Sequence, residues 1–205
     1  MVSRDFILWE VDVQVDFMLP SGKLYVPGAE KTLSNIRRLT DLARHGQVFL
    51  VSHGCFHTPD DPEFKVFPPH CVKGTPGAEF VPEALTDKVA RVANDPDATI
   101  PADLNPYQQI LLEKQTLNIF ESLHAGTLLQ RLPRGAEFVV FGVTTEYCVA
   151  FAAKGLLERG RRVALVRDAI MALNPPAGEE ALAAMQLAGA RVITTGQALL
   201  EIGAQ

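Results

Sequence analysis

The chain has 205 residues, of which 47% are hydrophobic and 21% are charged, with a formal net charge of -5. This length predicts one globular domain, spanning residues 1–205. Its 24 acidic and 19 basic residues are interspersed, without the basic stripe that nucleic acid requires, so we expect no nucleic-acid partner. We expect no membrane association either, because no apolar run has the length of a membrane helix and no signal-peptide pattern occurs. Three cysteines, an odd number, favour a reducing, cytoplasmic setting over a disulfide framework.

Strand-like apolar runs alternate with helix-like segments along the chain. Six runs predict buried strands: Phe6–Val13, Val48–Ser52, Gln109–Glu113, Phe138–Gly142, Val163–Val166 and Arg191–Thr194. Apolar residues at helical spacing predict four helices: Glu30–Arg44, Gly126–Leu132, Glu146–Glu158 and Gly178–Leu187. Near-continuous apolar strands separated by helices are typical of a parallel sheet covered on both faces. We therefore expect an α/β fold with three layers.

One segment fits neither pattern. Residues 53–82 are rich in prolines, acidic residues and histidines, and an irregular excursion of this length in a compact domain is usually functional. Open parallel sheets bind ligands beyond the carboxyl ends of their strands. We therefore expect the chemistry of this protein at that edge of the sheet.

Three ionisable side chains of different type come at predicted strand ends. Asp12 closes the first strand, Lys114 follows the strand Gln109–Glu113, and Cys148 lies where a strand gives way to a helix. Each has an ordinary structural alternative, namely a turn-capping carboxylate, a solvated lysine and a small core thiol. A thiol in the first turn of a helix is expected to have a lowered pKa, because the positive end of the helix dipole is close. An acid, an amine and a thiol together are suited to nucleophilic catalysis.

The residues around these positions resemble a known family. The segments Asp12–Phe17, Pro68–Phe80 and Gly142–Val149 are similar to motifs of the isochorismatase-like superfamily of cysteine hydrolases, and within it to the nicotinamidases. The similarity runs from about Ile7 to Thr195, nearly the whole chain. It implies a six-stranded parallel sheet with helices on both faces. It also implies an amidohydrolase that cleaves a small carboxamide, such as nicotinamide, through a thioester.

The resemblance assigns roles to single residues. Three would form the catalytic triad: Asp12, Lys114 and Cys148. A cis peptide between Val143 and Thr144 would direct the backbone N–H groups of Thr144 and Cys148 into an oxyanion hole. Phe17 and Phe120 would lie along the substrate pocket. Burial should raise the pKa of Asp12 and a lysine beside it should lower that pKa, and the sequence does not decide between them.

Nicotinamidases hold a metal in the loop after the second strand, through one aspartate and three histidines, and this metal binds the pyridine nitrogen of the substrate. The corresponding residues in this chain are Cys55, His57, Glu63 and His70. Two of the four differ in type from the family's set, but thiolate, imidazole and carboxylate all bind zinc. The softer thiolate favours zinc over manganese or magnesium. The alternative is a vestigial site that binds no metal.

Other functions stay open at this point. The same chemistry could act without a metal on a ureido or N-carbamoyl compound, or the altered loop could mark a non-catalytic, ligand-binding homologue. Glu10 precedes Asp12 by two residues and should face the same side of its strand, so it either perturbs Asp12 or is a polar residue at a sheet edge. Related proteins form homo-oligomers, and the resemblance implies that state here.

Overall fold

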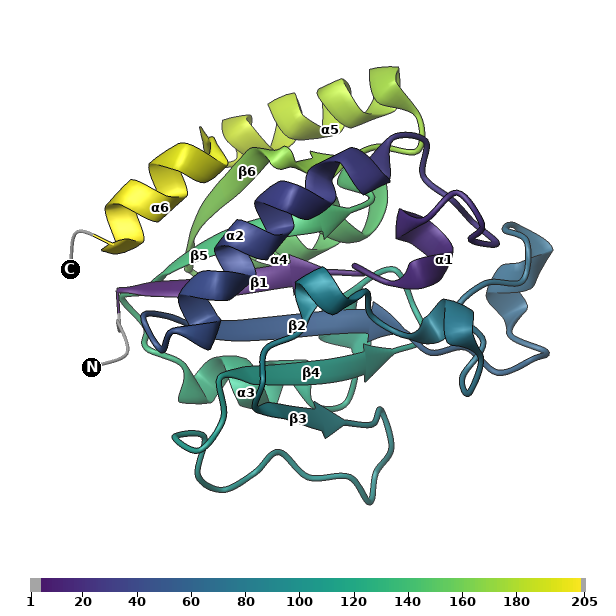
Figure 1. The fold of residues 1–205 in the computed structure, drawn as a ribbon, viewed down its shortest axis with the longest axis horizontal. Coiled ribbons are helices and arrows are strands. Elements are labelled where there is room, and N and C mark those ends of the chain that lie inside the picture. Colours follow the sequence, from purple (N-terminus) through teal and green to yellow (C-terminus); the bar gives the residue numbers. More distant parts are fainter. Residues whose placement is uncertain (1–4, 204–205) are drawn as a thin grey trace.

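The computed structural model describes residues 5–203. A parallel sheet of seven strands runs through it, in the order β3-β4-β2-β1-β5-β6-β7 (Figure 1). The strands are β1 (Phe6–Val11), β2 (Phe49–Cys55), β3 (Val89–Val92), β4 (Gln109–Lys114), β5 (Glu137–Val143), β6 (Arg162–Met171) and β7 (Arg191–Ile193). All neighbouring strands pair in parallel. The first strand in the chain, β1, is therefore central, with β2 and β5 on either side.

Helices cover both faces of this sheet. They are α1 (Val15–Met18), α2 (Leu33–Arg44), α3 (Ala125–Arg131), α4 (Ala150–Glu158), α5 (Pro175–Leu187) and α6 (Thr195–Gly203). On one face, α2 and α6 bury Leu39 and Ile202. On the other, α3, α4 and α5 bury Leu128, Leu156 and Met185 (Figure 1). The predicted α/β class, with a parallel sheet between two helical layers, is confirmed.

Three elements of the structure were not predicted from the sequence: the short helix α1, the strand β3 and the helix α6. The sheet has seven strands and not six, because β3 pairs with β4 at one edge. This strand has only four residues and carries the exposed Arg91, as is usual for edge strands, so it leaves little periodic signal in the sequence. The helix α6 lies beyond the last predicted element and buries Ala198 and Ile202.

The irregular excursion is shorter than residues 53–82. Strand β2 continues to Cys55 and so includes the first three residues of that range. The remainder contains two short 3-10 helices, Pro62–Lys65 and Pro76–Ala78, joined by irregular chain. The excursion thus begins at the carboxyl end of β2, close to the end of β1 in the neighbouring position of the sheet.

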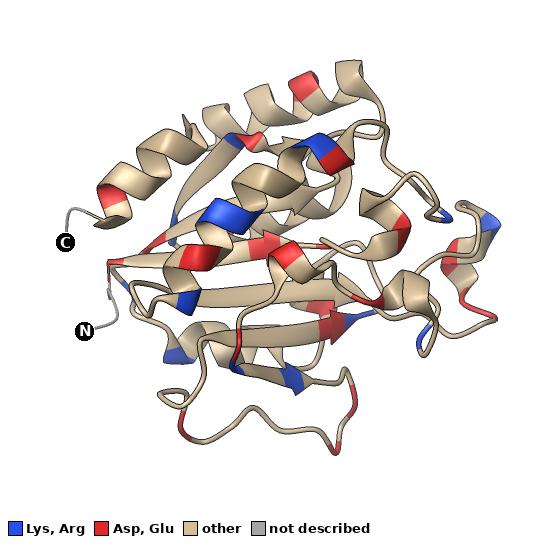
Figure 2. Cartoon of the chain, in the orientation of Figure 1, with Lys and Arg blue, Asp and Glu red and all other residues tan. Residues whose placement is uncertain are grey.

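Charged residues of both signs are interspersed over the described elements (Figure 2). Among residues 5–203, no helix combines the length and apolar character needed to cross a membrane.

A buried polar chain crosses the sheet on the face covered by α2. Ser52 Oγ donates to Glu10 Oε2 at 2.6 Å, and Gln109 Nε2 donates to Ser52 Oγ at 2.7 Å. Burial raises the pKa of Glu10 to about 8, although Ser52 and Arg44 oppose the rise. Glu10 lies in the central strand, so its interpretation as a sheet-edge residue is wrong.

Replacing Glu10 with glutamine should stabilise the protein at neutral pH and leave it almost unchanged at pH 4.5. The carboxyl ionises from its ordinary value of 4.5 in the unfolded chain but only near pH 8 in the fold, so stability falls as pH rises between these values. The gain for Glu10→Gln at pH 7 should be on the order of 3 kcal/mol. Denaturant unfolding at pH 4.5 and pH 7 measures it, and an equal gain at both would contradict a buried neutral carboxyl.

Candidate active site

An acid, an amine and a thiol lie next to one another at the ends of strands in the sheet. Asp12 follows β1, Lys114 ends β4, and Cys148 lies in a π-helical turn, Thr145–Val149, that joins β5 to α4. Lys114 Nζ is 3.0 Å from Asp12 Oδ2 and 3.5 Å from Cys148 Sγ. The ammonium group therefore holds the carboxylate and the thiol side by side, at the carboxyl ends of the strands.

Asp12 is buried at the turn that ends β1. Its φ of 52° lies in the left-handed region, which few residues other than glycine adopt and which is common at functional sites. Burial raises the pKa of Asp12 to about 7, and Cys55 adds to the rise while Lys114 opposes it. Burial thus outweighs the neighbouring ammonium. The carboxyl becomes a proton acceptor matched to neutral pH.

Cys148 keeps its proton at rest. Its pKa is raised well above the usual value by its hydrogen bond with Cys55, then by burial and by the charge of Asp12. This direction is opposite to the expectation from the helix start, because Cys55, burial and Asp12 all raise the pKa of Cys148. A thiol in this state needs a base, and interaction with Cys148 lowers the pKa of the Asp12 carboxyl.

The peptide bond between Val143 and Thr144 is cis, as predicted. Thr144 and Cys148 both line a cavity beside the acid, the amine and the thiol. The turn that carries Cys148 is π-helical, a conformation that is rare overall and frequent at functional sites. The assignment of the Thr144 and Cys148 N–H groups to an oxyanion hole stays a prediction.

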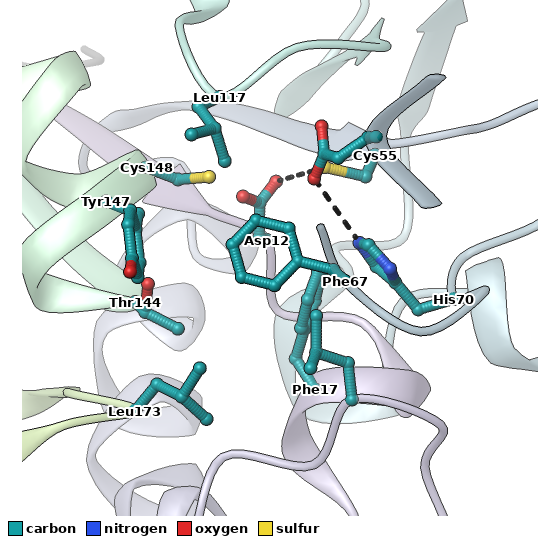
Figure 3. Close-up of a pocket in the computed structure, with 12 residues that line it drawn as sticks. Asp12, Phe17, Cys55, Phe67, His70, Leu117, Thr144, Tyr147, Cys148 and Leu173 are labelled. Atoms are coloured by element: carbon teal, nitrogen blue, oxygen red, sulfur yellow. Dashed lines mark hydrogen bonds and ion pairs between the residues drawn. The ribbon is translucent and has the colours of Figure 1, made fainter. Parts of the chain in front are cut away.

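This cavity is mostly apolar, with the reactive groups along one side (Figure 3). Its walls comprise Asp12, Phe17, Leu24, Cys55, Glu63, Phe67, His70, Leu117, Thr144, Tyr147, Cys148 and Leu173. The position predicted for Phe17 is therefore found. The position predicted for Phe120 is wrong, because its ring stacks on Trp9 with centroids 6.2 Å apart and lies under the Arg159 guanidinium.

Two polar side chains next to Asp12 fasten the excursion over the site. Gln14 Nε2 donates to the carbonyl oxygens of Cys55 and Ala78, both at 2.7 Å. The backbone N–H of Cys71 donates to Asp16 Oδ2 at 2.7 Å. Sequence analysis did not single out Gln14 and Asp16, although their alternation with Asp12 after β1 was a signal that could have found them.

Three of the four predicted metal ligands lie together next to the acid and the amine. The ligand atoms of Cys55, His57 and His70 are all within 4.8 Å of one another, and all three residues are buried. Glu63 is not within that set of three, but its Oε1 is 3.8 Å from His70 Nε2. The four predicted metal ligands therefore lie close together, with Glu63 next to the group of three.

Neighbouring oxygen atoms orient both imidazole rings. Asp61 Oδ2 is 2.9 Å from His57 Nδ1, and the Pro68 carbonyl oxygen is 2.8 Å from His70 Nδ1. Such contacts are typical of metal-binding histidines, because they turn the other ring nitrogen toward the ion. His57 Nε2 is buried and has no hydrogen-bond partner among the described residues. These residues fit a metal ion, and Asp61, four residues after His57, supports one of the ligands.

Cys55 connects the candidate ligands to the reactive groups. Its Sγ is 2.8 Å from Lys114 Nζ, closer than Cys148 Sγ is to the same atom. The hydrogen bond from Cys148 lowers the pKa of Cys55 well below its usual value, and Lys114 and the two histidines add to this against the effect of burial. Because metals bind the thiolate form of cysteine, this environment favours Cys55 as a ligand.

Known proteins share this architecture. Residues 7–92 and 84–197 match the family described as the isochorismatase domain. The chain is 27% identical to a nicotinamidase of Escherichia coli (strain K12) over 208 residues, 90% of this chain and 92% of that protein. It superposes on a pyrazinamidase of Pyrococcus horikoshii in complex with zinc with a TM-score of 0.74 and 27% identity, over 93% of this chain and 99% of that one. For an N-carbamoylsarcosine amidase from Thermoplasma acidophilum, the TM-score is 0.70 and the identity 25%, over 92% and 95% of the chains.

The family match covers most of the chain, and the solved structures share its fold over nearly their full length. This protein therefore belongs to the isochorismatase family of hydrolases.

Zinc should stabilise the protein, and His57→Ala should abolish the effect. An ion that binds only the folded state at a thousandfold excess over Kd contributes about 4 kcal/mol. Thermal unfolding with and without zinc, with elemental analysis, measures this. His45→Ala, which removes an exposed histidine, should behave as the parent does. If elemental analysis finds no bound metal and added zinc changes neither the parent's melting temperature nor its rate, the site is vestigial.

Proposed function

We propose that this protein is a cysteine-dependent amidase that hydrolyses a small, nicotinamide-like carboxamide to a carboxylate and ammonia. The observation that carries the proposal is the contact of Lys114 with both Asp12 and Cys148 beside a cavity. The names of its relatives, a nicotinamidase, a pyrazinamidase and an N-carbamoylsarcosine amidase, support an amide as the substrate class. A cytoplasmic location and a homo-oligomeric state stay predictions.

The first half of the reaction forms a thioester. Asp12 accepts the proton of Cys148, and the sulfur attacks the amide carbonyl carbon. The carbonyl oxygen takes up negative charge, which the N–H groups of Thr144 and Cys148 would stabilise by about 3 kcal/mol each. Asp12 then returns its proton to the amide nitrogen, the C–N bond breaks, and ammonia leaves.

The second half regenerates the enzyme. Asp12, again ionised, accepts a proton from water while the water oxygen attacks the thioester carbonyl. The C–S bond breaks, the carboxylic acid leaves, and the proton on Asp12 returns to Cys148. Lys114 stays charged throughout, so it balances whichever of the two neighbours is the anion.

A divalent metal would be held by Cys55, His57 and His70, with Glu63 beside them, and the thiolate favours zinc. When bound, it supplies a positive charge for the ring nitrogen of a pyridine carboxamide, as the family resemblance implies. The apolar walls formed by Phe17, Phe67 and Leu173 suit a flat ring. A metal-free hydrolase of an N-carbamoyl compound is the second candidate, favoured by the similarity to N-carbamoylsarcosine amidase.

Cys148→Ala should abolish ammonia release while leaving the melting temperature within a few degrees of the parent's. Asp12→Asn should be nearly as damaging, because it removes the proton acceptor and preserves the shape. An ammonia-release assay on nicotinamide and a panel of amides measures both. Cys71→Ala is the matched control: that thiol is also buried but lies outside the cavity lining, so activity should persist. Parental activity in Cys148→Ala would overturn the nucleophile assignment.

Chelation should separate the two candidate substrates. If a metal holds the ring nitrogen, a chelator should reduce the rate on pyridine carboxamides more than the rate on amides without that nitrogen. His57→Ala, assayed in the absence of a chelator, should show the same selective loss of rate on pyridine carboxamides. An equal loss on both kinds of amide would contradict a metal contact with the ring, and no loss on either would favour the metal-free hydrolase.

A further inference from the structure

His53 is a buried polar side chain that the proposed reaction leaves without a role. It lies in β2 with no solvent exposure, and neither ring nitrogen has a hydrogen-bond partner among the described residues. Buried polar atoms are nearly always paired, and an unpaired one costs about 1–3 kcal/mol. A histidine in this state lowers stability, so its position calls for an explanation beyond packing.

The unpaired ring lies against the proposed catalytic base. His53 Nδ1 is 3.9 Å from Asp12 Oδ1. The backbones of the two residues are also joined, because the Asp12 N–H donates to the His53 carbonyl oxygen at 2.9 Å. The indole of Trp9 meets the imidazole edge to face, with ring centroids 5.9 Å apart. The imidazole is therefore held between an aromatic ring and the carboxylate.

Asp12 Oδ1 lacks a lasting donor of its own. Lys114 bonds to the other oxygen, Oδ2, at 3.0 Å. The Cys55 sulfur is 4.0 Å from Oδ1, and a thiol is only a weak hydrogen-bond donor. Cys148 gives up its proton in the proposed reaction, so it cannot donate to the carboxylate at every stage. Among the described residues, His53 has a ring nitrogen near Oδ1 that can donate throughout the reaction.

We propose that His53 is a positioning residue whose Nδ1–H donates to Asp12 Oδ1 and fixes the carboxylate toward Cys148. The inference rests on the proposed role of Asp12 as the base. A shift of about 1 Å brings the two atoms within hydrogen-bond distance, and catalytic hydrogen bonds are often long before substrate binds. A histidine ring carries at least one N–H in either protonation state, so His53 can act as a donor.

His53→Phe tests this directly, because it keeps a ring beside Trp9 and removes the N–H. Its kcat on the amide turned over fastest should fall about 10- to 100-fold, as for other partners that orient a reacting group. KM and zinc content should stay near the parent's values, and the melting temperature should not fall. His53→Asn, whose amide nitrogen stands close to the place of Nδ1, should restore most of the lost kcat.

Thr40→Val is the matched control. Thr40 Oγ1, like the ring nitrogens of His53, is a buried polar atom with no hydrogen-bond partner among the described residues. It lies in α2, away from the cavity lining, so its removal should leave kcat unchanged. Should His53→Phe fail to fold, His53→Leu makes the same comparison.

Parental kcat in the folded Phe or Leu variant would overturn the proposal, and so would an equal loss in the Phe and Asn variants. Failure of the proposed function is distinguishable, because Cys148→Ala would then retain activity. If Cys148→Ala is inactive and His53→Phe is fully active, only the inference about His53 fails.

Discussion

An ammonium group with no contact to solvent is the constraint on which the site depends. Lys114 is fully buried, and an isolated charge in such a place would cost several kcal/mol. Burial alone would lower the pKa of Lys114, but its three partners raise it well above its usual value. These partners are Asp12, Cys55 and Cys148. Because Cys148 keeps its proton at rest, Asp12 and Cys55 supply the negative charge that compensates the ammonium group.

The ammonium group of Lys114 also contacts two thiols whose pKa values shift in opposite directions. Cys55, at 2.8 Å, is the closer and has the lowered pKa, whereas Cys148, at 3.5 Å, has the raised one. The two sulfurs hydrogen-bond to each other, so the negative charge of one disfavours ionisation of the other. Cys55 is thereby suited to bind a cation as a thiolate, whereas Cys148 stays protonated until a base accepts its proton. The distinction comes from position, because both residues are ordinary cysteines.

The sequence was sufficient to bring Asp12, Lys114 and Cys148 together, because each follows a strand and the carboxyl ends of parallel strands meet at one edge. It was not sufficient for features that depend on partners distant in the chain. Phe17 and Phe120 are chemically identical, and only packing turns one toward the cavity and the other toward Trp9.

The pKa of Cys148 could not be inferred from its helix, since Cys55 comes from another strand and reverses the shift. The short strand β3 has too few residues for a periodic pattern, and the orphaned nitrogens of His53 are visible only once its surroundings are known.

Gln14 and Asp16 bear on how such a site can diversify. Both lie outside the excursion, yet their side chains hydrogen-bond to its backbone at Cys71 and Ala78, and Gln14 also bonds to the backbone of Cys55 at the end of β2. Backbone groups are the same whatever side chain a residue carries. The path of the excursion is thereby set separately from the identity of the ligands along it. Position 55 can therefore carry a cysteine in place of the aspartate that the family resemblance implies. The backbone places either side chain at the same point beside the cavity.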